Sequence, residues 1–228
     1  MKRYYFTIAS ILVLAIGITS CSNEETKTQT QVAARPTVPI QNAEVQIGTQ
    51  VWMTKNLNVS RYRNGDPIPQ VTDPTQWASL TTGAWCYYNN DMANGPIYGK
   101  LYNWYAVNDP RGLAPLGWHI PSDAEWTTLS NFLGGINLAG GKMKATNTLW
   151  NNPNTSATNS CGFTGLPGAG RSNFNGVFYT AGRNGSWWSS SEDDPFFVWY
   201  RSLRYNNGNL ERSNIPKTEG MSVRCIKD

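Results

Sequence analysis

The chain has 228 residues and a formal net charge of +4, which falls to +2 when Lys2 and Arg3 are set aside. So small a net charge, without a run of lysine or arginine, argues against binding to nucleic acid or to an acidic surface. The counts of 10 Trp, 11 Tyr and 21 Gly, with only 15% charged residues, are typical of a loop-rich and strand-rich domain outside the cytoplasm.

Residues 1–20 predict an export signal, because Lys2 and Arg3 precede an apolar run over 4–18 that is shorter than the ~20 residues of a spanning helix. The run ends in Ile18-Thr19-Ser20-Cys21, which resembles the bacterial lipobox. That resemblance implies acylation of Cys21, which would become the mature N-terminus and hold the protein stably on a membrane. An ordinary secretory signal with a chance cysteine is the alternative.

Residues 21–43 predict a flexible tether, because this polar segment holds too few apolar side chains to offset the entropy of ordering it. Its start, Ser22-Asn23-Glu24-Glu25, resembles the surface-export signal of Bacteroidetes lipoproteins. We therefore expect an outer-membrane lipoprotein that can be displayed outward, although a plain solvated linker fits the same residues. Residues 44–228 are of a length that suits one domain with a sizeable core.

The first part of this domain alternates apolar and polar residues over 44–59 around Gly48-Thr49, which predicts a β-hairpin. A loop over 64–67 and a short helix near Trp77 follow. Residues 83–91 predict an aromatic strand that ends in a polar turn. The spacing of apolar residues over 98–109 predicts a helix.

A second helix is predicted over 123–133, because Ser122 and Glu125 form a capping box and Gly134-Gly135 provides a stop. The face that it would bury comprises Trp126, Leu129, Phe132 and Leu133. His119, the only histidine, lies in the connection before this helix and has no nearby cysteine or serine motif. We expect it to be a structural, hydrogen-bonded residue.

The C-terminal part predicts strands, with Asn207-Gly208 as a strong hairpin signal. In the strand before this turn, period-two alternation places one set of side chains on a common face: Phe197, Trp199, Arg201, Leu203 and Tyr205. In the last strand, Met221, Val223 and Cys225 share a face that we expect to point inward.

Six motifs occur in this order: VWMTKNL, YGKLYNWYAVNDPRGL, GWHIPSDAEW, GFTGLPGAGR, WWSSSE and SVRCIKD. Together they resemble the Fibrobacter succinogenes major paralogous domain family, over nearly all of residues 45–228. The resemblance implies an α+β, C-type lectin-like domain, with two helices flanking antiparallel β-sheets and long loops on one side.

Relatives in this family often carry a cysteine where this chain has Ala114, and that cysteine is expected to pair with the one in the terminal motif. The resemblance therefore implies a substitute disulfide between Cys161 and Cys225, worth roughly 3–5 kcal/mol in the chain-entropy model. Three buried thiols are the alternative. Cys86 is left unpaired in either case.

The lectin-like fold implies a binding module, possible ligands being glycans, because aromatic rings stack on sugars and arginine can hold their hydroxyl groups. The residues we expect to contact a ligand are Trp188, Tyr200, Arg201, Tyr205 and Arg171. We expect Trp187, Phe197 and Trp199 to be mostly buried.

Calcium is the usual device of lectin relatives for binding sugars, and it needs six to eight oxygen ligands. The acidic cluster Glu192, Asp193 and Asp194 is the candidate calcium site, with a charged surface turn as the alternative. No other cofactor is expected.

The fold also hosts sulfatase-modifying enzymes, which need a redox pair of cysteines near the C-terminal strands. This chain has tryptophan and serine in the corresponding GSWWSSS motif, and it contains no GxSxG, HExxH or P-loop motif. We therefore expect a non-catalytic protein without catalytic residues. A structural or adhesion protein that binds a protein partner is the alternative to glycan binding.

Overall fold

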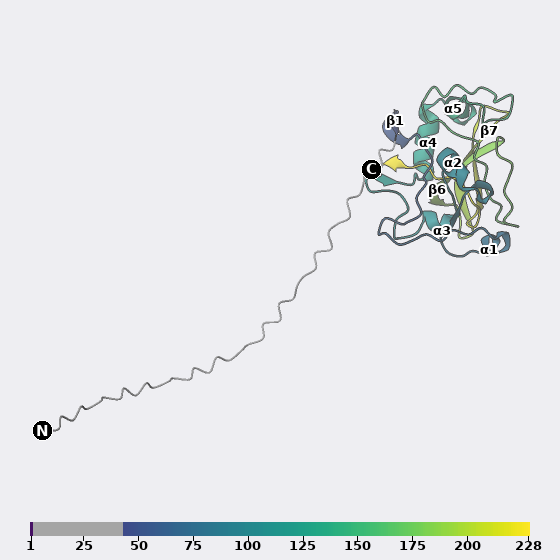
Figure 1. Cartoon of the computed structure of the whole chain (residues 1–228). Helices are drawn as coiled ribbons and strands as arrows, with labels where there is room; N and C mark the ends of the chain where they lie inside the picture. Colours follow the sequence, from purple (N-terminus) through teal and green to yellow (C-terminus); the bar gives the residue numbers. More distant parts are fainter. Residues whose placement is uncertain (2–42) are drawn as a thin grey trace. The chain divides into compact units, whose positions relative to one another are not determined.

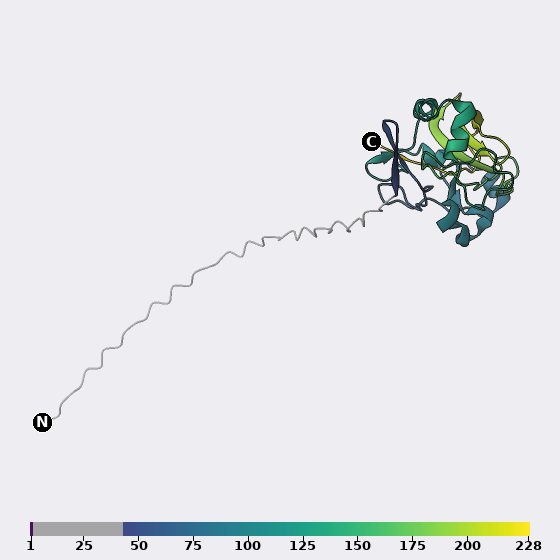
Figure 2. The same cartoon turned by 90° about the horizontal axis from the view of Figure 1, so that it is seen from above.

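The computed structural model describes Met1 and residues 43–228 (Figure 1). Residues 2–42 hold the predicted signal peptide, Cys21 and nearly all of the predicted tether, so those predictions lie outside the described residues. Residues 43–228 form an α+β domain of small antiparallel sheets, short helices and long loops (Figure 2). Within this part, no helix is both long and apolar enough to cross a bilayer.

The first sheet joins the two ends of the domain. The predicted hairpin is confirmed as strands β1 (Glu44–Ile47) and β2 (Gln50–Met53), with Gly48 at φ 63° in the turn. The sheet has the order β1-β2-β9-β5, in which β9 (Ile226–Lys227) lies between β2 and β5 (Trp118–His119). The C-terminus therefore lies beside the start of the domain, as Figure 1 shows.

The largest sheet is formed by β6 (Asn184–Glu192), β7 (Phe197–Arg204) and β8 (Leu210–Pro216), in that order. All its pairs are antiparallel. The predicted hairpin is confirmed, because Asn207-Gly208 lies in the connection 205–209 between β7 and β8, directly after a turn at Tyr205 and Asn206.

The segment between β2 and β5 contains short elements. They are α1 (Pro74–Ala78), β3 (Trp85–Cys86), two 3-10 helices η1 (Tyr88–Asn90) and η2 (Met92–Asn94), α2 (Gly95–Tyr98), β4 (Leu101–Tyr102) and α3 (Trp104–Val107). The helix predicted over 98–109 is therefore confirmed only in its second half, as α3. Leu101 and Tyr102 pair with β3, and the Asn103 side chain caps α3 by accepting from the Ala106 amide.

The helix predicted at 123–133 is confirmed as α4 (Asp123–Phe132), with both hydrogen bonds of the Ser122–Glu125 capping box. Phe132, predicted to be buried, is 63% exposed. A further helix that the sequence analysis did not predict, α5 (Ile136–Met143), follows the two glycines. Gly140 lets α5 approach the chain before β8, because a Cβ there would collide with the Asn209 carbonyl.

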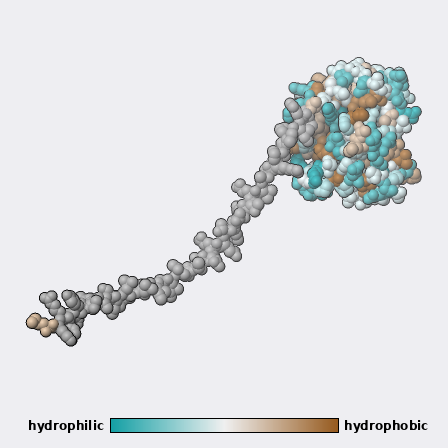
Figure 3. Space-filling model, in the orientation of Figure 1, coloured by the Kyte–Doolittle hydropathy of each residue, from teal (hydrophilic) through white to brown (hydrophobic). Residues whose placement is uncertain are grey.

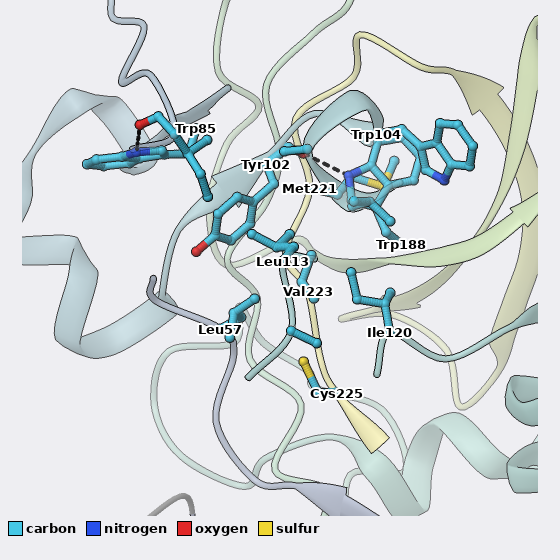
Figure 4. Packing of buried hydrophobic residues seen from close by; sticks show 14 of the residues in the cluster. Leu57, Trp85, Tyr102, Trp104, Leu113, Ile120, Trp188, Met221, Val223 and Cys225 are labelled. Atoms are coloured by element: carbon cyan, nitrogen blue, oxygen red, sulfur yellow. Dashed lines mark hydrogen bonds between the residues drawn. The ribbon is translucent and has the colours of Figure 1, made fainter. Parts of the chain in front are cut away.

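The interior contains three hydrophobic clusters, all formed by residues within 47–226. Met221, Val223 and Cys225 lie in the first cluster (Figure 4), so the inward direction predicted for them is confirmed. The second cluster lies around α4 and α5 and includes Trp126 and Trp187. Because residues within 47–226 supply three hydrophobic clusters, we expect the domain over 43–228 to fold on its own.

Candidate functional site

Three of the five residues predicted to contact a ligand are buried, and the prediction is wrong for them. Trp188, Arg171 and Arg201 have almost no exposed surface. The Trp188 indole donates a hydrogen bond of 2.7 Å to the Tyr102 carbonyl within the first cluster (Figure 4). In β6 the consecutive residues Trp187, Trp188 and Ser189 are all buried, so both faces of the strand are covered there. Alternation along the strand therefore did not distinguish a buried face from an exposed one.

The two buried arginines hold parts of the domain together. The Arg171 guanidinium donates to the carbonyls of Val71 and Thr72, at 2.7 Å each, and to that of Gly176 at 2.8 Å. Arg201 donates to Asp123 Oδ1 at 2.7 Å, which joins β7 to the start of α4. These contacts give both buried guanidinium groups hydrogen-bond acceptors, although Nε of Arg201 has none among the described residues.

The three aromatic residues predicted to be mostly buried differ in how much of their surface is exposed. Trp187 is fully buried, as predicted, whereas Phe197 is exposed at the start of β7. Trp199 is half-buried, and the Arg212 guanidinium stacks on its ring at 3.3 Å from the centroid.

The three domain cysteines are free thiols, so the predicted Cys161–Cys225 disulfide is wrong. The alternative of three buried thiols holds for Cys86 and Cys225, whereas Cys161 is only half-buried. Cys225 belongs to the first core cluster, whereas Cys161 packs against the second and its thiol donates to the Lys142 carbonyl at 3.2 Å. Burial raises the pKa of the Cys86 and Cys225 thiols to about 12. Thiolates, the reactive form, are therefore strongly disfavoured at both positions.

The acidic cluster predicted for calcium forms a turn in which each carboxylate has a separate partner. Glu192 pairs with Lys217 at 2.9 Å, and Asp193 accepts from the Asn214 amide. Asp194 accepts from the Phe196 and Phe197 amides and so closes the turn between β6 and β7. Within residues 43–228, no group of three or more His, Cys, Asp or Glu residues is arranged to hold a metal ion.

The structural role expected for His119 is confirmed by its contacts. Its Nδ1 lies 2.7 Å from Asp228 Oδ1, and its Nε2 lies 2.8 Å from Glu125 Oε1. Burial acts to lower the pKa of His119, but the two carboxylates outweigh it and raise the pKa above 6.5. His119 therefore connects the C-terminal residue to the capping box of α4.

One face of the β6–β7–β8 sheet carries a cavity of about 180 Å³, which we call the Glu219 pocket. Tyr200, one of the predicted ligand residues, lies in its wall, whereas Tyr205 packs against the second core cluster and does not line it. The lining residues are Ala169, Gly170, Tyr179, Asn184, Ser186, Tyr200, Ser202, Arg204, Ile215, Glu219 and Met221.

Strand pairing brings the polar part of this lining together. Asn184 and Ser186 on β6 stand opposite Arg204 and Ser202 on β7. The Ser186 hydroxyl donates to the Ser202 hydroxyl at 3.3 Å. Because these residues are two positions apart along each strand, their side chains point to the same face.

Glu219 is the unusual residue of the pocket, because its side chain is 0% exposed and only half satisfied. Oε2 accepts a hydrogen bond of 2.8 Å from the Asn173 amide, whereas Oε1 has no partner among the described residues. Burial raises the pKa of Glu219 to about 7, against the opposing effects of the Asn173 amide and the Tyr179 hydroxyl. A buried carboxylate oxygen without a donor is costly and marks a candidate binding position.

Two tyrosines line the pocket together with this carboxylate. Burial and the charge of Glu219 raise the pKa of Tyr179 to about 12, and burial raises that of Tyr200. Both phenols are therefore neutral at physiological pH and can donate or accept a hydrogen bond. Beside them, Arg204 lies 2.7 Å from Glu211 and is neutralised by it.

Of the pocket's residues, the sequence analysis identified Tyr200 and missed Glu219, Tyr179, Ser186 and Ser202. The alternation of Asn184 and Ser186 with buried Gly185 and Trp187 was the available signal for a polar face on β6. Glu219 carried no such signal. It lies in a turn after β8, and only packing from several segments buries it.

Small antiparallel sheets, short helices and a polar pocket on the largest sheet define this α+β domain. The chain belongs to the Fibrobacter succinogenes major domain family, whose profile matches residues 45–227. This match covers all the residues that line the Glu219 pocket. No curated protein and no solved structure matches the chain.

Proposed function

We propose that the chain is an exported lipoprotein with a non-catalytic binding domain that holds a glycan in the Glu219 pocket. The observation that supports this proposal is a polar cavity with hydroxyl groups, tyrosine rings and one unsatisfied carboxylate oxygen. Sugar hydroxyl groups both donate and accept hydrogen bonds, so they suit a lining that mixes serine, tyrosine, asparagine and glutamate.

The size of the pocket favours a small group. Its volume of about 180 Å³ lies below the ~300–1,000 Å³ of sites for drug-sized ligands. A single sugar ring at the end of a glycan fits this scale better than an extended oligosaccharide. The rings of Tyr179 and Tyr200 supply apolar surface for the C–H face of such a ring.

The proposal includes a C-type lectin-like fold for the domain, supported by the order of the motifs and by the α+β architecture. It also includes acylation of Cys21 and attachment to the outer membrane, with display on the cell surface, supported by the lipobox-like exit of the apolar N-terminal run. Calcium is an optional partner of the glycan.

A glycan array with the domain over 43–228, in the presence and absence of calcium, tests the binding function. We expect hits that Ser186→Leu abolishes, because leucine would fill the pocket. Ser190→Leu on the same strand is the matched control, since Ser190 is also half-buried but does not line the pocket. Hits that survive Ser186→Leu, or an array without hits, would refute glycan binding in this pocket.

The anchor has a separate test. Cells that express the full chain and are fed a labelled fatty acid should label the wild type and leave Cys21→Ser unlabelled. Equal labelling of the two proteins would show that Cys21 is not the lipid attachment site.

Recognition of a protein partner is the second candidate, and an exposed loop beside the pocket favours it. Phe174 is 88% exposed, and Val177 and Tyr179 on the same loop are also exposed. Hydrophobic residues interrupt the hydrophilic surface elsewhere too, as the brown areas in Figure 3 show. Apolar surface of this kind marks protein contact sites. An array without hits, together with a partner whose binding Phe174→Ser abolishes, would favour this function.

A further inference from the structure

The Glu219 pocket contains one carboxyl group that the described residues leave without a positively charged partner. Glu219 and Arg204 are the charged residues in its lining, and Arg204 is already paired with Glu211. The Asn173 amide donates to Oε2 of Glu219, and the neighbouring Tyr179 hydroxyl acts to lower the pKa of this carboxyl. Oε1 is buried and makes no hydrogen bond to the described residues, and Glu219 belongs to the lining of the pocket.

We propose that the pocket selects a ligand that carries a protonated primary amine, as in an amino sugar, and that this ammonium donates to Oε1 of Glu219. The inference rests on the proposed function, because it names the class of sugar that the same site binds. The ring hydroxyls of the ligand would then meet Ser186, Ser202 and Tyr200, which line the remaining wall.

The physical reason is the cost of the buried carboxylate. An ionised group that is removed from water without a partner is strongly destabilised, and an opposite charge at hydrogen-bond distance offsets that cost. Charge-assisted hydrogen bonds are roughly twice as strong as neutral ones. A neutral hydroxyl at the same place would donate to Oε1 but would not compensate the charge of the ionised Glu219 carboxylate. An acidic sugar would add a second negative charge to a small pocket.

Matched sugar pairs test this selectivity, because each pair differs only in an amine and a hydroxyl. The probes are glucosamine and glucose, galactosamine and galactose, and mannosamine and mannose, titrated into the domain over 43–228 at pH 7. We expect the amino sugar of at least one pair to bind tenfold or more tightly than its neutral partner. In Glu219→Gln this ratio should fall below threefold.

The control variant is Glu192→Gln, which removes one negative charge at an exposed site outside the pocket and should keep the wild-type ratio. Thermal melting shows whether each variant is folded. A folded Glu219→Gln that keeps the amine preference would overturn the assignment to Glu219.

Proton release gives an independent readout. A bound ammonium favours the charged carboxylate, so amine binding should expel protons from the roughly half-protonated Glu219 at pH 7. Calorimetry in two buffers of different ionisation enthalpy measures this release. The same titration of Glu219→Gln measures the protons that the amine itself gains or loses, and this number is subtracted from the wild-type value.

The outcomes separate the two proposals. Equal binding of amino and neutral sugars, or no proton release beyond that of Glu219→Gln, would refute the amine selectivity and leave glycan binding intact. If no sugar of any pair binds, both the amine selectivity and glycan binding in this pocket are refuted.

Discussion

The free energy of unfolding of Glu219→Gln, relative to that of the wild type, should be greater at high pH than at low pH. Folding raises the pKa of this carboxyl from 4.5 to about 7, because burial disfavours the charged form. At ~1.36 kcal/mol per pKa unit, this rise corresponds to about 3 kcal/mol. The folded state binds the proton more tightly, so this contribution to wild-type stability is complete below pH 4.5 and is lost as pH rises through about 7.

Glutamine has nearly the same shape and does not titrate. The difference in free energy of unfolding between Glu219→Gln and the wild type should therefore grow by about 3 kcal/mol between pH 4 and pH 8. Any constant cost of an unpaired amide cancels in this comparison. Urea unfolding of the domain over 43–228, followed by tryptophan fluorescence across this range, measures it.

Glu192→Gln is the matched control, because Glu192 is exposed on the same sheet. It shows how the loss of an exposed carboxylate from this sheet changes the same measurement. If Glu219→Gln and the wild type give parallel curves from pH 4 to pH 8, the carboxylate is not buried without a partner, and the argument for the pocket fails.

Three further changes test other parts of the structure. An NMR titration of the single histidine should give a pKa above 6.5, and His119→Gln should cost stability below pH 6.5 but progressively less as pH rises through the folded-state pKa. Lys144→Met should cost several kcal/mol in urea unfolding, because the buried ammonium makes three hydrogen bonds to part-buried carbonyls that are worth ~1–3 kcal/mol each, whereas Lys142→Met should cost little. Trp188→Ala should cost ~3–5 kcal/mol in the same assay, and a loss of ligand binding without such destabilisation would contradict its place in the core.

The sequence by itself determined the elements whose signals are local. The Ser122–Glu125 capping box, the turn at Gly48-Thr49 and the turn at Asn207-Gly208 each act through residues a few positions apart, and all three predictions were confirmed. The order of the motifs also led to the correct family. The helix predicted over 98–109 was right only for α3, because pairing with β3 competes with local helix propensity at Leu101 and Tyr102.

The tertiary structure alone decided which polar and aromatic side chains are buried. Arg171 is enclosed by segments about 100 positions away in the chain, and Trp188 bonds to a carbonyl 86 positions away. Cys161 and Cys225 lie in different parts of the core, which neither their spacing nor the family resemblance could reveal. The Glu219 pocket likewise needs three strands and two loops at once, because an unpaired carboxylate oxygen is defined by what surrounds it in space.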